Sequence, residues 1–201
     1  IYMITFTLFS ALATFYFTMF FTPGPNNAML TASGLKFGFV RTLPHLIGIP
    51  LGHIVQIGLT CFGLANVFLF YPQVQFYMKI LCFLYLIYLG WKMIGSFSVV
   101  QKESGRPLKF YEASLFQFIN PKAWSIAVTV ASGFFPTEEN IFIGISFVTI
   151  TAAFICFPTI SLWALFGSGL RKFVGNTKVK KIVEYLLAIL LVLTGIFILI
   201  K

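Results

Sequence analysis

Long runs of apolar residues, each free of charged side chains, dominate this chain. The runs without Lys, Arg, Asp or Glu are residues 1–35, 42–78, 123–137, 140–170 and 185–200. A helix of about 20 apolar residues is long enough to cross the hydrocarbon core of a bilayer. The pattern therefore predicts an all-α protein that crosses a membrane several times.

Hydropathy and helix-breaking residues divide these runs into six predicted transmembrane helices. They cover residues 1–21, 43–64, 74–97, 110–135, 141–167 and 182–200. At residues 1–21 we expect a membrane span rather than a cleaved secretion signal, because this stretch has no basic start and no small-residue cleavage site.

A polar segment, residues 98–109, separates three predicted spans from three more. We expect a single membrane transport domain over residues 1–201, with halves 1–97 and 110–201 joined by 98–109 as a cytoplasmic linker. Since three is an odd number, the second half enters the membrane from the side opposite to the first. Such a relation is an inverted-topology repeat, a common basis of secondary transport.

Charged residues are few, and they lie unevenly between the spans. Hydrophobic residues make up 59% of the chain and charged residues 9%, with a net charge of +9. Ten of the fourteen Lys and Arg residues follow the first, third and fifth spans: Lys36, Arg41, Lys102, Arg106, Lys109, Arg171, Lys172, Lys178, Lys180 and Lys181. Short cytoplasmic loops carry such an excess. We therefore expect both termini outside, and the positive charge requires no nucleic-acid partner.

The first helix break lies inside the 35-residue uncharged run, at Thr22-Pro23-Gly24-Pro25-Asn26-Asn27. A straight helix of that length would extend about 50 Å, beyond a hydrocarbon core of about 30 Å. Two prolines around a glycine end one helix, and an asparagine is suited to cap the next, which we expect from about Asn27 to Gly34. The run must therefore bend or re-enter the membrane.

The second helix break is Asn120-Pro121-Lys122, near the middle of the fourth apolar segment. Asparagine as the N-cap with proline at the first helical position starts a helix, so residues 110–119 and 121–135 should be separate helices. Free N–H groups at such a start bind anions such as a substrate carboxylate. Lys122 in the first turn opposes the helix dipole unless an anion is near.

We therefore expect a substrate site at the two breaks, formed by Pro23, Gly24, Pro25, Asn26, Asn27, Asn120, Pro121 and Lys122. The alternative is that Pro-Gly-Pro is a tight turn at the membrane surface and that Lys122 extends to the cytoplasmic face.

His53 is the one candidate for carrying a coupled proton, because it is an ionisable side chain inside a predicted span and imidazole titrates near neutral pH. A core histidine bonded to a neighbour is an equal alternative. His45 is nearer the basic loop and is expected at the membrane surface. Gln56 and Asn66 could pair with the backbone or line a path.

Catalytic and cofactor chemistry has little support in this sequence. The five acidic residues fall in loops or near span ends, and the chain has no phosphate-binding G-x-x-x-x-G-K-[ST] loop. Cys61, Cys82 and Cys156 are isolated in apolar runs, which favours burial over redox chemistry. We expect no enzyme, no metal and no cofactor.

Small and aromatic residues have structural roles in this interpretation. Close approach of helices is expected at Gly58, Gly63, Gly90 and Gly95. The 26 phenylalanines supply packing and lipid-facing surface.

The residues of the two breaks resemble the LysE/RhtB family of bacterial amino-acid exporters. The resemblance is carried by Thr22 to Asn27 and by Asn120-Pro121-Lys122-Ala123, with support from Leu84-Tyr85-Leu86-Ile87-Tyr88-Leu89-Gly90-Trp91-Lys92. Within the family, residues 114–120 and 163–167 look most like the branch that exports cysteine and O-acetylserine. Many members have an acidic residue where this chain has His53 after Gly52, so His53 is a candidate by its own chemistry only.

The resemblance implies a multi-pass protein of the bacterial inner membrane that exports small amino acids by proton antiport. Cysteine, O-acetylserine, homoserine, threonine or similar compounds would be substrates, with protons and the lipid bilayer as the other partners. A homo-oligomer is compatible with the sequence. The alternative is a structural or lipid-handling membrane subunit that transports no amino acid.

Overall fold

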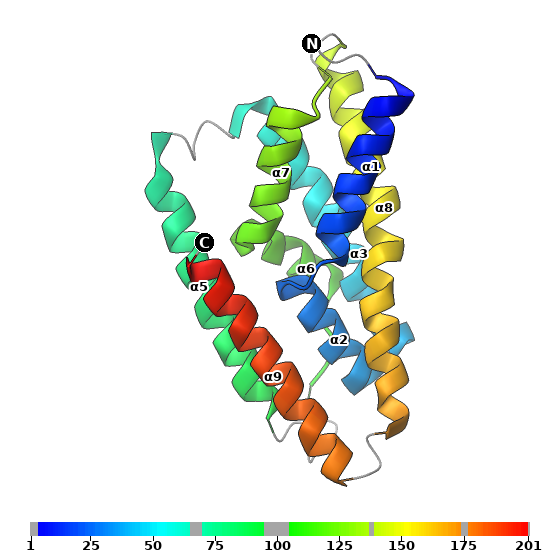
Figure 1. Ribbon diagram of the computed structural model, residues 1–201, viewed down its shortest axis with the longest axis vertical. Helices are drawn as coiled ribbons and strands as arrows, with labels where there is room; N and C mark the ends of the chain where they lie inside the picture. The colour runs from blue at the N-terminus through cyan, green and yellow to red at the C-terminus, as the bar shows by residue number, and fades with distance from the viewer. Residues whose placement is uncertain (1–3, 65–69, 95–104, 137–138, 174–176, 201) are drawn as a thin grey trace.

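The computed structural model describes residues 4–64, 70–94, 105–136, 139–173 and 177–200, and the secondary structure in these ranges is entirely helical (Figure 1). Most of the predicted linker, residues 98–104, lies outside the described residues, as does Asn66. The predicted all-α class is confirmed for the part of the chain that the structure describes.

Helices occupy all six predicted ranges, and both predicted breaks are present. The first half contains α1 (Phe6–Phe21), α2 (Pro25–Phe37), α3 (Phe39–Leu59), the π-helical turn η1 (Thr60–Leu64) and α5 (Pro72–Met93). The second half contains α6 (Phe110–Phe116), the 3-10 turn η2 (Gln117–Ile119), α7 (Pro121–Gly133), α8 (Ile141–Leu170), the 3-10 turn η3 (Arg171–Phe173) and α9 (Thr177–Ile200).

Two described helices are long and apolar enough to cross a membrane, one over Phe39–Gly63 and one over Ile141–Leu170. The bent pair α1 and α2 gives a third if the pair counts as one span. Large apolar side chains such as Phe6, Trp91 and Phe154 are more than three-quarters exposed. An exposed apolar surface of this kind is expected where helices face lipid.

Local sequence explains where the helices near the breaks begin and end. Thr5 caps α1, with its hydroxyl oxygen accepting a hydrogen bond from the Leu8 N–H at 3.1 Å. The helix ends at Phe21 because the prolines that follow lack the N–H needed to continue it. Gly38, with φ at 84°, allows the chain to turn sharply from α2 into α3.

The core forms where α1, α3, α7 and α8 meet. Tyr16 of α1 is completely buried there, and its hydroxyl donates to the Val148 carbonyl of α8 at 3.0 Å. Helices α5 and α9 pack against each other at one side of the bundle, the left in Figure 1. The two halves therefore share one core.

Glycines bring helices of the two halves into backbone contact. A Cβ at Gly34 of α2 would overlap the carbonyl oxygen of Ala164 in α8, and one at Gly167 of α8 would overlap that of Thr31 in α2. Gly48 and Gly52 bring α3 equally close to α6. Of the glycines expected at such contacts, Gly90 faces Ala188 of α9.

The expectation of close helix approach at Gly58 is wrong. The nearest atom to a Cβ there would be a side-chain carbon of Ile145 at 3.9 Å, an ordinary contact. Gly95 lies outside the described residues.

The two ends of the bundle differ in charge. The helix ends that flank the basic connections, at the α2–α3 junction, after α5 and after α8, lie at the bottom in Figure 1. The start of α1, the end of α7 and the start of α5 lie at the top. This separation is the one that the charge pattern predicts for a protein with a cytoplasmic and an outer end.

Candidate functional site

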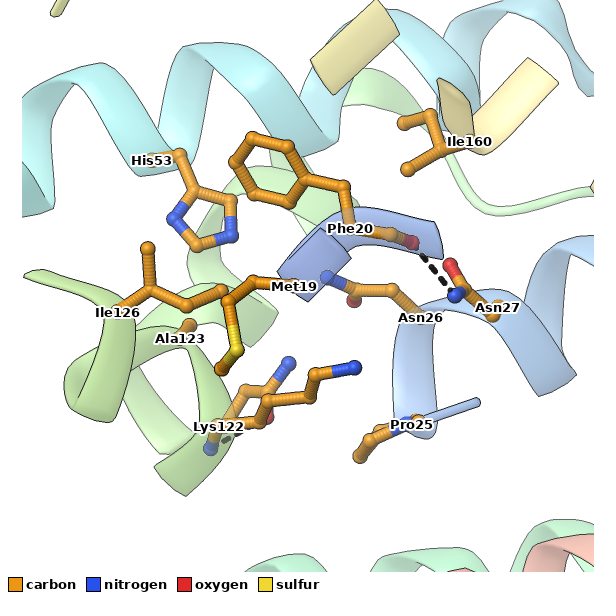
Figure 2. A pocket seen from close by; sticks show the side chains of 12 residues that line it. Met19, Phe20, Pro25, Asn26, Asn27, His53, Lys122, Ala123, Ile126 and Ile160 are labelled. Carbon is orange, nitrogen blue, oxygen red and sulfur yellow. Dashed lines mark hydrogen bonds between the residues drawn. The ribbon is translucent and has the colours of Figure 1, made fainter. Parts of the chain in front are cut away.

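The two helix breaks face each other around a single pocket (Figure 2). Helices α1 and α2 bend by 56° at the first break. The second break separates η2 from α7 at Asn120. The pocket is lined by Met19, Phe20, Gly24, Pro25, Asn26, Asn27, His53, Asn120, Lys122, Ala123, Ile126 and Ile160.

Most residues predicted for the substrate site line this pocket, as does the proton-carrier candidate. They are Gly24, Pro25, Asn26, Asn27, Asn120, Lys122 and His53. Pro23 and Pro121 are not among the lining residues: the carbonyl of Pro23 accepts a hydrogen bond from Lys122, and Pro121 is the first residue of α7. Residues almost 100 positions apart in the chain thus come together.

Lys122 connects the second break to the first. Its ammonium nitrogen donates to the Thr22 carbonyl at 2.7 Å, to the Thr22 hydroxyl at 2.9 Å and to the Pro23 carbonyl at 3.2 Å. A lysine ammonium has three N–H groups, so these three acceptors occupy all of them. The acceptors lie at the C-terminus of α1, where a helix carries partial negative charge.

The position of Lys122 changes its interpretation. The positive charge of Lys122 in the first turn of α7 is stabilised by the carbonyl oxygens of Thr22 and Pro23. A bound carboxylate is therefore not needed to stabilise this charge. The alternative in which Lys122 extends to the cytoplasmic surface does not describe this structure, because the side chain turns into the first break (Figure 2). A Cβ at Gly24 would lie 2.9 Å from the Cδ of Lys122, so glycine leaves room for this side chain.

Asn27 ties the two pieces of the first broken helix together. Asparagine was expected to cap α2, but Gly24 is the N-cap and Pro25 the first residue of the helix. The side-chain amide of buried Asn27 instead donates to the carbonyls of Phe20 and Thr22, both at 2.8 Å. It therefore pairs carbonyl groups that the end of α1 leaves free.

Replacing Asn27 with aspartate should destabilise the protein, because a carboxylate oxygen would then face two carbonyl oxygens. A buried polar group that loses its partner costs about 1–3 kcal/mol. We expect a lower thermal unfolding midpoint for the purified protein in detergent. Asn140→Asp is the control: exposed Asn140 caps α8 through its side-chain oxygen, a role aspartate performs equally well. Equal midpoints for both variants would contradict this role of Asn27.

The two half-helix N-termini differ in the donors they offer. At α7 the side-chain oxygen of Asn120 accepts from the Lys122 N–H at 3.1 Å, and its carbonyl accepts from the Ala123 and Trp124 N–H groups. At α2 the N-cap is glycine, and no side chain caps the helix. The N–H groups of Asn26 and Asn27 in its first turn are the donors left for an anion.

His53 lies in α3 and is 1% exposed. The ring of Phe20 contacts it edge-on, with centroids 5.3 Å apart. Its Nδ1 atom has no hydrogen-bond partner, which is uncommon for a buried polar atom. His45, expected at the membrane surface, is also buried, at 2% exposed, because α3 turns it into the protein.

Gln117 was missed by the sequence analysis. It is completely buried in η2, and its side-chain oxygen accepts from the side-chain amide of Asn26 at 2.8 Å. The sequence signal was a polar glutamine inside an apolar segment, three residues before the predicted N-cap Asn120. The apolar lining residues, such as Ile126 and Ile160, could not be distinguished from other membrane residues.

The pocket is too small for an amino acid in this conformation. The cavity volume is about 20 Å³, enough for roughly one water molecule. Entry of a larger molecule requires the surrounding helices to move apart. No cluster of three or more His, Cys, Asp or Glu side chains suited to a metal occurs among the described residues.

Comparison with known proteins agrees with the resemblance seen in the break residues. The family model of the LysE type translocators matches residues 17–201. A cysteine/O-acetylserine efflux protein of Salmonella typhi is 28% identical over 161 residues, which cover 80% of this chain and 82% of that protein. One of Escherichia coli (strain K12) is 27% identical over 162 residues, with coverage of 80% and 83%.

No solved structure matches the chain. The family match extends from α1 to the end of the chain and so includes both breaks and the pocket between them. This chain therefore belongs to the LysE type translocator family, as a multi-pass membrane transporter rather than an enzyme.

Proposed function

We propose that this protein is a secondary active exporter of small amino acids or their derivatives, with cysteine and O-acetylserine as the first candidates. Homoserine, threonine and similar compounds are further candidates. The observation that carries the proposal is the pocket where the two helix breaks meet, lined by Asn26, Asn27, Asn120 and Lys122. The names of the relatives, cysteine/O-acetylserine efflux proteins, support the substrate class.

The substrate carboxylate would bind between the N-terminus of α2 and Lys122. The N–H groups of Asn26 and Asn27 supply donors, and the helix dipole favours negative charge there. Lys122 would exchange one of its bonds to Thr22 or Pro23 for the carboxylate. Binding would thus loosen the link between the two breaks and favour the movement that opens the pocket.

The proposed architecture is six spans in two inverted repeats, residues 1–97 and 110–201. Corresponding helices make corresponding contacts: α1 packs against α8, and α6 packs against α3. The two long helices α3 and α8 contact each other, and so do α5 and α9. Exchange of the halves preserves this set of contacts, as a two-fold axis in the membrane plane requires.

The contacts of α2 and α7 do not follow this symmetry. Helix α2 packs tightly on α8 through Gly34 and Gly167, whereas α7 contacts α3 much less. A transporter with inverted repeats is expected to differ in this way when one side is closed, since alternating access exchanges the arrangements of the two halves.

We place the protein in the bacterial inner membrane with both termini outside. The basic helix connections at one end of the bundle support this orientation. A substrate panel tests the function directly: cells that produce the protein should release cysteine or O-acetylserine faster than cells without it. If cells with and without the protein release each amino acid of the panel at the same rate, export is contradicted.

Proton coupling is assigned to His53, because it lines the pocket and its Nδ1 has no partner. We expect His53→Gln to retain amino-acid flow down its own gradient and to lose the acceleration caused by an imposed pH gradient. The assay is export from membrane vesicles with and without that gradient.

His45→Gln is the matched control, since His45 is a second buried histidine of α3 with an unpartnered Nδ1 and does not line the pocket. It should respond to the pH gradient as the unaltered protein does. A normal response of His53→Gln would reject His53 as the proton carrier. Export that ignores the gradient in the unaltered protein would reject antiport.

A further inference from the structure

Three amide side chains connect the two halves of the protein beside the pocket: those of Gln56 and Gln117 are completely buried, and that of Asn26 is half-buried. The side chains of Asn26 and Gln117 bond each other in both directions, with the amide of Asn26 donating at 2.8 Å and that of Gln117 at 3.2 Å. Gln117 also donates to the Ala113 carbonyl at 2.8 Å. The amide of Gln56, from α3, donates to the main-chain carbonyl of Gln117 at 3.1 Å.

One acceptor in this group has no partner. The amide nitrogen of Gln56 donates to the main-chain carbonyl of Gln117, which fixes the orientation of the Gln56 side chain. The Oε1 atom of Gln56 is therefore the free end. Gln56 is completely buried, and Oε1 forms no hydrogen bond. A buried amide oxygen normally accepts at least one hydrogen bond, so this atom points to a donor that is supplied from elsewhere.

The group lies beside the pocket. Gln56 is three residues after His53 in α3, and positions three apart lie on the same face of a helix. His53 lines the pocket, as does Asn26, the partner of Gln117. Figure 2 shows His53 and Lys122 on opposite sides of Asn26. Lys122 is therefore the cation of the pocket lining, and the amide group adjoins the part of the lining that His53 and Asn26 form.

We propose that the amide oxygen of Gln56 binds the ammonium group of the exported amino acid, and that Gln117 positions Asn26 beside it. The inference rests on the proposed function. An ammonium group carries three N–H donors, and the free acceptor of Gln56 and the second lone pair of the Asn26 amide oxygen can receive two of them. Once the surrounding helices move apart, an amino-acid zwitterion would bind with its carboxylate toward Lys122 and its ammonium toward Gln56.

This arrangement selects for a free amino group. N-acetylation removes the positive charge of the amino group and leaves a single N–H. An N-acetylated amino acid would therefore leave an amide oxygen of Gln56 or Asn26 without a donor. Gln117 does not need to touch the substrate, because its bonds to Asn26 and Ala113 hold the Asn26 side chain in place.

The test measures thermal stabilisation of the purified full chain in detergent by L-cysteine, N-acetyl-L-cysteine and cysteamine, which lacks the carboxylate. A ligand that binds the folded protein raises its unfolding midpoint. We expect the unaltered protein to be stabilised more by cysteine than by N-acetylcysteine. Gln56→Met should reduce the cysteine and cysteamine shifts at least by half and leave the N-acetylcysteine shift unchanged.

Gln56→Glu is the companion variant, because a carboxylate still accepts hydrogen bonds from an ammonium group. It should retain or increase the shifts caused by cysteine and cysteamine. A purely structural role of Gln56 would reduce the shifts of all three compounds alike in both variants, which would overturn the proposal. Equal stabilisation of the unaltered protein by cysteine and N-acetylcysteine would overturn it too, even if Gln56→Met fails to fold.

The outcomes separate this inference from the proposed function. If the unaltered protein exports cysteine and the Gln56 variants keep the full preference for the free amino group, only the ammonium subsite is wrong. If none of the three compounds stabilises the unaltered protein and no amino acid is exported, the proposed function and the subsite both fail.

Discussion

Replacing Lys122 with glutamine is expected to lower the rate of amino-acid export at least tenfold. Glutamine is shorter and uncharged, so it loses the charge that would meet the substrate carboxylate and the three bonds to Thr22 and Pro23. One hydrogen bond to a charged group is worth about 1.5–3 kcal/mol, and about 1.4 kcal/mol corresponds to a factor of ten. The assay is efflux of cysteine or O-acetylserine from cells, normalised to the amount of protein in the membrane.

The control for this variant is Lys172→Gln, which removes an exposed lysine of η3 far from either break. It should export normally. Unchanged export by Lys122→Gln at normal membrane abundance would rule out the carboxylate role. A variant that is absent from the membrane would instead show that the bonds to α1 are essential for folding, and thermal unfolding of any purified remainder would measure that.

Replacing Gly167 with alanine is expected to destabilise the protein by about 1–3 kcal/mol, the usual cost of an extra methyl group in a packed contact. The new Cβ would overlap the Thr31 carbonyl oxygen and lie 2.8 Å from the Thr31 carbonyl carbon. Because these are main-chain atoms of α2, the helices must separate to make room. The measurements are the thermal unfolding midpoint in detergent and the amount of protein in the membrane.

Gly169→Ala provides the matched control in the same helix. Nothing lies within 4 Å of a Cβ at Gly169, and alanine stabilises a helix relative to glycine by about 0.5–1 kcal/mol. This variant should be as stable as the unaltered protein or slightly more so. Equal destabilisation by the two substitutions would contradict the close α2–α8 contact.

The local features of this fold could be predicted from the sequence because each has a local cause. Prolines without an N–H end α1, and Asn120 followed by Pro121 starts α7. Both breaks are therefore visible in a few consecutive residues. The predicted start of α2 was less accurate, because the Asn27 side chain donates to the carbonyls at the end of α1 instead of capping α2.

The contacts between distant residues could not be predicted in the same way. Lys122 and Thr22 are 100 positions apart, and nothing in either segment specifies the other. Glycine positions alone did not reveal which ones bring helices together, since Gly34 and Gly167 make backbone contact and Gly58 does not. Such contacts depend on which faces of two helices meet, and the sequence of one helix does not specify the helix that packs against it.

Export through the pocket is tested most directly by efflux of L-cysteine and O-acetyl-L-serine from liposomes that contain only the purified full chain. We predict release several times faster than from protein-free liposomes, faster still when a pH gradient is imposed, and near the protein-free rate with Lys122→Gln. Release at the protein-free rate for both compounds, with folded protein present, would contradict export through the pocket at the two helix breaks.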